Sequence, residues 1–359
     1  MIPFFQFRLE DLTKELIGSG LPEKKALYHS KQIFKWVYWR RVKSFEAMSD
    51  LPKNLRSELA LKISLDPILK MSCNQQSKDG TEKFLFELSD ANTLESVLIP
   101  AEDRLTICIS SQVGCAMGCK FCMTASQGLV RNLEVQEIVS QVYALSESSK
   151  ITNIVFMWMG EPLHNLENVC RAVEIFVTQE GLNFSKRKIT ISTSGLVPQI
   201  RQLNERLTGK ARVNLAISLN SSTNEQRTSV MPINKAFSIE KLLDACKDFK
   251  LDPHRRITFE YVMLGELNDT LEDAKRVSYL LKNIPSKINL IPYNPHPASP
   301  YKRPLDGSVE VFQKFLLDEG HTALIRHSRG RDILAACGQL RSAQEPARFE
   351  KNHLTPQQS

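Results

Sequence analysis

Beyond residue 105, short runs of β-branched and aromatic residues alternate with stretches in which apolar residues recur at helical spacing. Strands separated by helices pair in parallel, because a parallel neighbour is reached only through a long crossover connection. The alternation therefore predicts an α/β fold, and six such strands favour a partial TIM-like (β/α)6 barrel. The expected strands lie at residues 106–109, 154–157, 188–191, 214–218, 258–262 and 288–291, with a closing strand at 323–325.

The first 75 residues carry a different pattern. Apolar residues recur at helical spacing in two segments that are separated by glycine and proline. This pattern predicts a small N-terminal helical domain of helix-hairpin-helix-like form over residues 1–75. The periodic residues are Leu9, Leu12 and Leu16 in the first segment and Ile33, Phe34 and Val37 in the second.

Residues 76–100 have the pattern of a β-hairpin. Two apolar runs flank Asp90-Ala91-Asn92, which is typical of a turn. We interpret this hairpin as a bridge from the helical domain to a barrel domain over residues 101–345. The remaining residues, 346–359, are polar and are expected to form a C-terminal tail.

The charge of the chain is distributed unevenly. The sequence holds 47 Lys and Arg residues against 40 Asp and Glu, a net charge of +7. Residues 1–75 hold 13 basic and 8 acidic residues, so +5 of the +7 falls there. Basic surface attracts phosphates, which gives mild support for a nucleic-acid partner. The run at 34–41, Phe-Lys-Trp-Val-Tyr-Trp-Arg-Arg, fits either a nucleic-acid surface or an amphipathic helix with buried aromatics.

Two features bear on the compartment. No apolar stretch of 18 residues occurs, and the apolar run at the start is too short for a signal sequence. Eight cysteines in 359 residues suit a reducing compartment better than a disulfide framework. We therefore expect a cytoplasmic protein with no membrane attachment. Cys73, Cys170 and Cys246 are expected to be packing residues, and the last two lie among apolar residues at helical spacing.

Cys115, Cys119 and Cys122 form a C-x3-C-x2-C motif, which places three thiols within eight residues. Three thiolates on one loop can bind three irons of a [4Fe-4S] cluster and leave the fourth iron open for substrate. Two alternatives remain. The cysteines could share one face of a buried helix, although two glycines make that helix a poor one. They could also bind zinc, which would need a fourth ligand.

Polar residues fall where the expected strands end. In β/α barrels the loops that follow the strands converge around one mouth, so these residues are expected to form one binding site. Any one of them alone would more often belong to a turn. They are Gly160 and Glu161 after the second strand, Ser192 on the third, Ser218, Leu219 and Asn220 at the end of the fourth, and Asn294 after the sixth.

The cysteine spacing resembles the signature of the radical SAM superfamily. The resemblance implies that the open iron binds the amino and carboxylate groups of S-adenosylmethionine (SAM). It implies reductive cleavage of SAM to a 5′-deoxyadenosyl radical. The polar residues at the strand ends would then bind SAM, with the Glu161 carboxylate paired to its ammonium group.

Two further cysteine-bearing segments narrow the resemblance to the RlmN/Cfr family, which methylates adenosine in RNA. One is residues 108–115, Cys-Ile-Ser-Ser-Gln-Val-Gly-Cys, and the other is residues 329–340, Arg-Gly-Arg-Asp-Ile-Leu-Ala-Ala-Cys-Gly-Gln-Leu. Residues 328–332 and 259–261 resemble the RlmN branch, which methylates adenine C2. The Cfr branch, which methylates C8, is the near alternative.

The resemblance implies three catalytic residues. Cys337 takes a methyl group from one SAM, and the radical made from a second SAM abstracts a hydrogen atom from that methyl group. The methylene radical adds to adenine C2 and links the RNA to Cys337. Glu95 matches the general base that removes the C2 proton, and Cys108 then attacks Cys337, which releases the product and leaves a transient disulfide. Without the resemblance, Cys337 would be interpreted as a packed residue and Glu95 as a solvent-facing strand residue.

The resemblance also implies the partners. They are the peptidyl-transferase region of 23S rRNA, the tRNA adenosine beside the anticodon, and an electron donor such as flavodoxin; we expect a monomer. The rivals to C2 methylation are C8 methylation, a non-catalytic RNA-binding homologue and an unrelated radical SAM oxidoreductase. Two positions depart from the family, which usually has glycine in place of Trp158 and histidine in place of Asn220.

Overall fold

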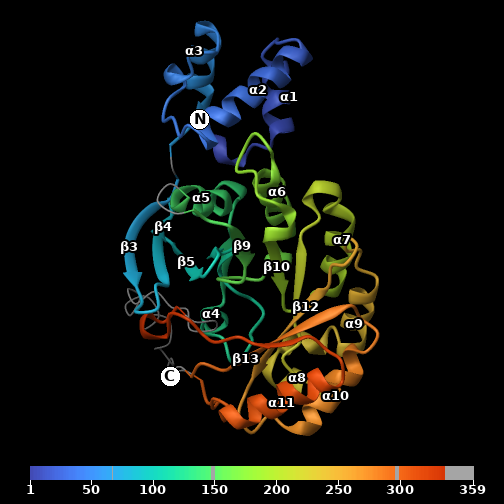
Figure 1. Ribbon diagram of the computed structural model, residues 1–359. Coiled ribbons are helices and arrows are strands. Elements are labelled where there is room, and N and C mark those ends of the chain that lie inside the picture. Colours follow the sequence, from blue (N-terminus) through green and yellow to red (C-terminus); the bar gives the residue numbers. More distant parts are fainter. Residues whose placement is uncertain (67, 147–149, 296–298, 336–359) are drawn as a thin grey trace, which may run out of the picture.

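A ten-stranded sheet runs through the described part of the chain (Figure 1). The structure is a computed structural model that describes residues 1–66, 68–146, 150–295 and 299–335. Strands β6 and β9 to β14 pair in parallel, and β3, β4 and β5 extend the sheet beyond β6 with antiparallel pairing. In sheet order the strands are β14 (Ala323–Ile325), β13 (Ser286–Pro292), β12 (Ile257–Met263), β11 (Asn214–Ser218), β10 (Ile189–Thr193), β9 (Asn153–Phe156), β6 (Arg104–Cys108), β5 (Thr93–Ala101), β4 (Glu82–Glu87) and β3 (Lys70–Gln76).

Helices connect the parallel strands and cover one face of the sheet (Figure 1). The predicted partial barrel is confirmed, and the expected strands differ from the observed ones by one or two residues at their ends. None of the helices in the described ranges is long and apolar enough to cross a membrane. The helices of this part are α4 (Met123–Ser126), α5 (Val135–Leu145), α6 (Leu166–Val177), α7 (Val197–Arg206), α8 (Asn224–Val230), α9 (Ile239–Lys247), α10 (Leu271–Leu281) and α11 (Asp306–Asp318), and a small sheet pairs β7 (Gln112–Gly114) with β8 (Leu129–Asn132).

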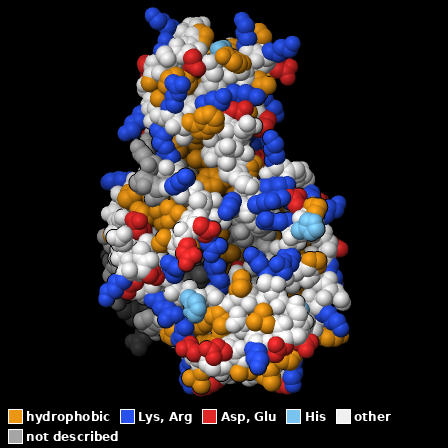
Figure 2. All heavy atoms as spheres, in the orientation of Figure 1, with side chains coloured by type: hydrophobic (Ala, Val, Ile, Leu, Met, Phe, Trp, Pro, Cys, Tyr) orange, Lys and Arg blue, Asp and Glu red, His pale blue; other side chains and the backbone are white. Residues whose placement is uncertain are grey.

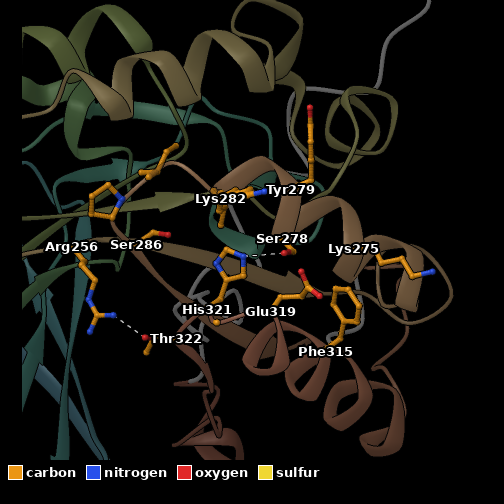
Figure 3. Close-up of a pocket in the computed structure, with 14 residues that line it drawn as sticks. Arg256, Lys275, Ser278, Tyr279, Lys282, Ser286, Phe315, Glu319, His321 and Thr322 are labelled. Carbon is orange, nitrogen blue, oxygen red and sulfur yellow. Dashed lines mark hydrogen bonds between the residues drawn. The ribbon is translucent and has the colours of Figure 1, made fainter.

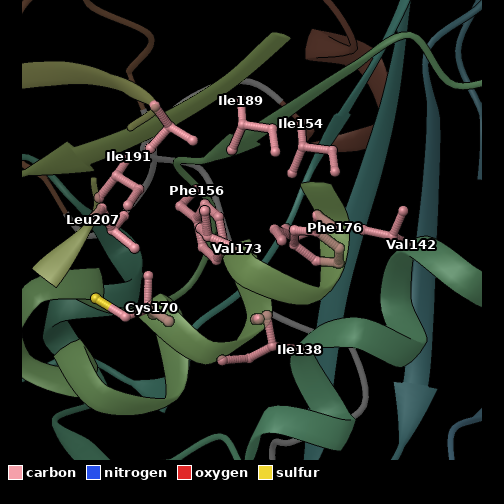
Figure 4. Close-up of a cluster of buried hydrophobic side chains, with 14 of the residues drawn as sticks. Ile138, Val142, Ile154, Phe156, Cys170, Val173, Phe176, Ile189, Ile191 and Leu207 are labelled. Carbon is pink, nitrogen blue, oxygen red and sulfur yellow. The ribbon is translucent and has the colours of Figure 1, made fainter. Parts of the chain in front are cut away.

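Figure 4 shows the apolar layer between the sheet and its covering helices. Helices α5 and α6 turn their apolar faces toward β9 and β10, and the side chains that meet there are buried. Cys170 lies among them, and Cys246 is buried in the same core, so the predicted packing role of both is confirmed. The same prediction for Cys73 is wrong, because Cys73 is only half-buried on β3, a strand whose other residues are exposed. The labelled residues are Ile138, Val142, Ile154, Phe156, Cys170, Val173, Phe176, Ile189, Ile191 and Leu207.

The N-terminal helices stand at one end of the molecule (Figure 1). The periodic leucines Leu12 and Leu16 lie on α1 (Leu9–Gly18) and are fully buried, as are Ile33 and Phe34 on α2 (Glu23–Tyr38). The two predicted helices therefore form because their apolar stripes face each other. They are followed by α3 (Lys53–Lys62) and by β2 (Ile63–Ser64), which pairs in parallel with β1 (Ile2–Pro3).

The aromatic and basic run at 34–41 is divided between the core and the surface, because three of its eight residues are buried and three are exposed. Phe34 and Tyr38 are buried in the core. Trp39 is 56% exposed, yet its Nε1 donates a 2.7 Å hydrogen bond to the carbonyl of Gly181. Arg41 donates to the carbonyl of Tyr143 at 2.7 Å. Of the two interpretations, the amphipathic helix is the correct one for the buried aromatics, and Trp39 and Arg41 join the helical region to the barrel.

The predicted hairpin exists, with β4 and β5 paired from Glu82↔Leu98 to Glu87↔Thr93. Its interpretation as a separate bridge needs correction, because β5 also pairs with β6 and so belongs to the main sheet. Strand β3 spans the boundary that was predicted at residue 75. The division into domains otherwise stays a prediction.

Candidate active site

The three clustered cysteines lie on the loop between β7 and α4. Cys115 is buried, and Cys119 and Cys122 are half-buried beside an apolar cluster that contains Met231. The backbone N–H of Cys115 donates to the carbonyl of Gly128 at 2.8 Å, and that of Cys122 donates to the carbonyl of Cys119 at 3.1 Å. The residues between them form turns, so the alternative of one helix face is wrong.

The electrostatics of these thiols fit a bound cationic group. Burial, together with the negative charges of Glu161 and Cys122, raises the pKa of Cys115 to about 12. Burial also raises the pKa of Cys119, as do the negative charges of Cys122 and Cys115. Because each thiolate opposes ionisation of the others, the loop favours thiolates only when positive iron is bound to them.

The loop is not shaped for a single ion. In the described ranges, no three His, Cys, Asp or Glu side chains are placed to hold one metal ion together. Thiolates that bind a four-iron cluster each bind a different iron, so their sulfurs need not converge on one point. The donor set, three thiols on one loop, therefore fits a cluster.

Glu161 lies at the carboxyl end of the sheet, five residues beyond the last residue of β9. Its Oε2 accepts a 2.7 Å hydrogen bond from the backbone N–H of Ser194, and its Oε1 accepts one of 3.0 Å from that of Leu163. Burial raises the pKa of Glu161, while these hydrogen bonds oppose the rise. The carboxylate thus ties β9 to β10, and each oxygen can still accept another donor. Pairing with the ammonium of SAM stays a prediction.

Gly160 allows the backbone before Glu161 to pack closely against Gln112. Its φ is +102°, and a Cβ there would lie 2.6 Å from the Cβ of Gln112. The side chain of Gln112 in turn accepts a hydrogen bond from the Glu161 backbone N–H at 2.8 Å. No residue with a side chain fits at position 160 without moving this contact.

The other residues predicted to bind SAM lie at the same edge of the sheet, but their side chains differ in burial and in hydrogen bonding. Ser192 and Ser218 are half-buried on β10 and β11, and Leu219 is fully buried. Asn220 has φ +57° and its side chain is committed to internal bonds: Oδ1 accepts from the Val262 N–H at 2.8 Å. The amide of Asn220 therefore fixes the start of the following loop.

Two buried oxygens at this edge lack a hydrogen bond of normal geometry within the described residues. Asn294 Oδ1 has none, and Ser194 Oγ has none although its hydroxyl is near enough to Glu161 to lower the pKa of that carboxyl. Buried polar atoms are nearly always hydrogen-bonded, so unsatisfied ones indicate a missing polar partner. They fit the amino-acid or ribose groups of a bound SAM, which are rich in such partners.

Arg227 is a site residue that the sequence did not reveal. It is fully buried and donates to the carbonyls of Ser194 at 2.6 Å, Ser218 at 3.0 Å and Leu219 at 3.1 Å. Burial lowers the pKa of its guanidinium to about 10. Arg227 therefore holds the carboxyl ends of β10 and β11 together. Three of its partners are backbone carbonyls, which leave no sequence signal, and the fourth is Oδ1 of Asn234, to which it donates at 3.1 Å.

A second group of buried side chains, which we call the pocket, lies on and against the neighbouring strands β5 and β6; it consists of Glu95, Val97, Cys108, Trp158 and Ala335. Glu95 is 2% exposed and Cys108 is 3% exposed. Val97 pairs with Cys108 in the β5–β6 ladder, so Cys108 and Glu95, two residues from Val97, lie on one face of the sheet. Trp158 and Ala335 pack on that face against Cys108. The interpretation of Glu95 as solvent-facing is wrong.

Gln141 of α5 fixes the backbone of this pocket and was also missed. Its Oε1 accepts from Ser96 Oγ and from the Ser110 N–H, both at 2.8 Å. Ser110 Oγ donates to the carbonyl of Glu95 at 2.6 Å. All of these groups are buried, so one amide side chain links the strand of Glu95 to the loop that leads to the cluster cysteines.

The C-terminal part of the described chain is held against this pocket by the β3–β4 turn. Asp79 accepts a 2.8 Å hydrogen bond from the Gly330 N–H, and Ser77 Oγ donates to Asp332 at 2.6 Å. The segment ends at Ala335, which is 3% exposed. Cys337 follows two residues later and lies outside the described residues, so its predicted role is not tested by the structure.

A separate surface depression of about 520 Å³ lies at the opposite, amino end of the parallel strands (Figure 3). It is lined mainly by α10 and by the segments that precede β12, β13 and β14. His321 Nε2 is 3.0 Å from Ser278 Oγ, and Arg256 donates to Thr322 at 2.7 Å, so several of its polar groups are already paired. None of the predicted site residues lines this depression.

Comparison with known proteins places this geometry in a family. Residues 109–277 match the radical SAM superfamily, and residues 7–65 match the ribosomal RNA large subunit methyltransferase N-terminal domain. The chain is 49% identical over 341 residues to a protein of Geobacter sulfurreducens named dual-specificity RNA methyltransferase RlmN, a match that covers 95% of this chain and 92% of that protein. The chain belongs to the RlmN family. A protein of the same name from Syntrophotalea carbinolica is 47% identical over 98% of this chain and 94% of its own.

A solved structure agrees with this assignment. The crystal structure of a radical SAM methyltransferase from Sphaerobacter thermophilus superposes with a TM-score of 0.85 and 41% identity, covering 95% of this chain and 99% of its own. Membership of the RlmN family and of the radical SAM superfamily implies a [4Fe-4S] cluster and SAM as cofactors. The cysteine loop and the strand ends are the parts of the chain that fit them.

Gly114 tests the cysteine loop. Its φ is +75°, and a Cβ there would lie 1.9 Å from the carbonyl oxygen of Gly128. We expect Gly114→Ala to displace the loop, so that reconstituted protein holds less than half of the wild-type iron. Gly209→Ala is the matched control, because Gly209 has φ +53° but open space around it, and only the backbone cost of about 1 kcal/mol applies. Equal iron content in both variants would contradict the expectation.

A substitution at Arg227 tests whether its side chain stabilises the carboxyl ends of β10 and β11. Arg227→Met leaves buried carbonyls without their donor, at about 1 to 3 kcal/mol each, so we expect stability to fall by about 3 kcal/mol or more and SAM binding to weaken. Chemical unfolding and equilibrium dialysis measure the two effects. Arg206→Met removes only an exposed ion pair with Glu167 and should cost about 1 kcal/mol or less. A stable Arg227→Met protein with unchanged SAM affinity would refute this role.

Asp79 tests the anchoring of the C-terminal segment. Burial alone would raise the pKa of Asp79, but hydrogen bonds from Thr81 and Gly330 lower it to about 2. Its contribution is therefore complete above about pH 4 and is lost as the pH falls toward about 2. We expect Asp79→Asn to speed hydrogen exchange in residues 330–335 at neutral pH, whereas Asp103→Asn, at an exposed turn, should leave it unchanged.

Proposed function

We propose that this chain methylates C2 of adenosine in RNA. Relatives named dual-specificity RNA methyltransferase match this chain over nearly their whole length. The observation that carries the proposal is the position of Glu95 and Cys108 on one face of β5 and β6, in a buried pocket bounded by the segment that ends at Ala335. A base and a resolving thiol at the same pocket are what release of a product from Cys337 requires.

The cofactors bind at the carboxyl end of the sheet under this proposal. Cys115, Cys119 and Cys122 hold three irons of the cluster and leave one open, and Glu161 together with the β10 and β11 ends holds SAM. Two SAM molecules per turnover supply a methyl group and a carbon radical. Burial of this edge excludes water, which would otherwise quench reactive species.

The protein residues then act in sequence. Cys337 carries the methyl group and becomes bonded to C2 of the adenine. Glu95 accepts the proton from C2, and the electrons of that C–H bond stay with the ring. The Cys108 thiolate attacks the Cys337 sulfur and a disulfide forms. The electron pair of the broken Cys337–carbon bond stays with the carbon, which takes up a proton to become the methyl group, and the single electron left from the radical addition would return to the cluster. Burial raises the pKa of Glu95, which suits a base that must take up a proton near neutral pH.

The substrates under this proposal are the peptidyl-transferase region of 23S rRNA and the tRNA adenosine beside the anticodon. Figure 2 shows Lys and Arg side chains over the N-terminal helices, and the first half of α2 exposes Lys24, Lys25 and Tyr28 to solvent. Cations and an aromatic ring on one surface suit an RNA loop with unstacked bases. We further propose a cytoplasmic monomer that receives electrons from a donor such as flavodoxin.

The proposal is tested by mass spectrometry of nucleosides from rRNA and tRNA treated anaerobically with reconstituted protein, SAM and reductant. We expect 2-methyladenosine with the wild-type chain and none with Cys337→Ala. Cys108→Ala should instead retain RNA bonded to the protein, visible on a denaturing gel. Cys170→Ala, at a packing position far from the pocket in sequence, is the control and should remain active.

Each other outcome has a defined meaning. Only 8-methyladenosine would assign the chain to C8 chemistry. No methylated base from a protein with full iron content would favour the non-catalytic homologue. Product from Cys337→Ala at the wild-type rate would reject the covalent route, and SAM cleavage uncoupled from RNA would favour another radical SAM reaction.

A further inference from the structure

Lys83 and Glu95 form a buried ion pair on neighbouring strands. In the β4–β5 ladder, Lys83 pairs with Val97 and Leu85 pairs with Glu95, so the two charged side chains are diagonal neighbours on one face of the sheet. The distance between Lys83 Nζ and Glu95 Oε1 is 3.9 Å, and the side chains are only 10% and 3% exposed. Lysine is almost never buried to this degree without a partner, so the pair accounts for its position.

This pair does not have the geometry of a structural ion pair. At 3.9 Å no hydrogen bond joins the two groups, and Glu95 Oε2 accepts none from any described residue. Glu137, another buried carboxylate, accepts two bonds of 2.8 Å from Arg131 and one from the Glu134 N–H. A buried ion pair adds little to stability unless its hydrogen bonds are completed. One oxygen of the Glu95 carboxylate, Oε2, therefore has no hydrogen-bond donor among the described residues.

Among the described residues, Lys83 is the cation whose charge acts on the Glu95 carboxyl. Burial raises the pKa of the Glu95 carboxyl, and the charge of Lys83 and then the indole N–H of Trp158 lower it. The indole N–H is near enough to act on the carboxylate, although Trp158 Nε1 makes no hydrogen bond of normal geometry with a described residue. From the other elements around the pocket, β6 contributes the Cys108 thiol and the C-terminal segment contributes apolar Ala335.

We propose that Lys83 is a positioning residue for proton transfer, whose ammonium group keeps the Glu95 carboxylate ionised and its free oxygen available to the substrate. The inference rests on the proposed role of Glu95 as the base. In the step concerned, the C2–H bond breaks, an O–H bond forms on Glu95, and the bonding electrons remain with the purine ring. Lys83 keeps its proton throughout and touches neither substrate nor cofactor.

The test is Lys83→Met compared with Lys83→Arg, which keeps the charge. Without the cation the base is ionised only at higher pH, so the release of RNA from its bond to the protein should slow about tenfold at pH 7 for each unit of pKa change. We expect RNA–protein adduct to accumulate at pH 7 and to decline as the pH is raised. Formation of methylated Cys337 and of 5′-deoxyadenosine, which precede this step, should stay near wild type. Lys83→Arg should restore release.

Lys70→Met is the matched control. Lys70 forms a similar cross-strand pair with Glu87, at 3.7 Å on β3 and β4, but its side chain is 81% exposed. We expect no adduct from this variant. If Lys83→Met fails to fold, as judged by thermal unfolding and iron content, Lys83→Gln keeps a polar group and allows the same comparison.

Glu95→Gln separates this inference from the proposed function. If Glu95→Gln traps adduct at every pH while Lys83→Met releases product like the wild-type chain, the role of Lys83 is rejected and that of Glu95 stands. If Glu95→Gln releases product normally, Glu95 is not the base and both fail. A Lys83→Met defect that is independent of pH and is not restored by arginine would also overturn the inference, because it would indicate a structural role.

Discussion

The antiparallel pairing of β5 with β6 is the constraint on which the site depends. It joins the hairpin to the parallel sheet and sets Val97 opposite Cys108. Because side chains alternate along a strand, a register shift of one residue would turn Glu95 away from Cys108 and toward the opposite face. The register is fixed on that opposite face by Leu94 and Leu98, which are buried in the main core. Ordinary apolar packing thus places a polar pocket.

Buried polar side chains form the hydrogen bonds that the strand ends cannot form within the sheet. Parallel strands end in carbonyls that need donors, and the buried Arg227 supplies them at β10 and β11. On the other side Gln141 does the same for the chain around Ser110. Arg227 and Gln141 each make four hydrogen bonds inside the protein, whereas Glu95, Ser194 and Asn294 each keep a buried oxygen without a normal hydrogen bond to a described residue. This difference in hydrogen bonding distinguishes residues that stabilise the site from residues that can bind a ligand or substrate.

The sequence predicted what depends on local pattern. Strands such as 214–218 and the paired stripes of α1 and α2 follow from periodicity, and the cysteine loop follows from spacing. Lys83, Arg227 and Gln141 were missed because their partners are distant in sequence or are backbone carbonyls. Without the family resemblance Glu95 would be assigned to solvent, because the local pattern cannot reveal that Trp158 and residues 330–335 cover that face of the sheet.

One short segment connects the two halves of the site. Trp158 packs beside Cys108, while Gly160 and Glu161, two and three residues later, reach the carboxyl edge beside Ser194. The backbone at Gly160 packs so closely against Gln112 that a Cβ would lie 2.6 Å from the Cβ of Gln112, so the path between these two ends is tightly constrained. A tryptophan where the family usually has glycine fills the pocket beside Cys108 and leaves the Gly160 turn and the Glu161 hydrogen bonds in place. The departure at position 158 therefore bears on the shape of the pocket around Glu95 and Cys108 more than on the edge where SAM is proposed to bind.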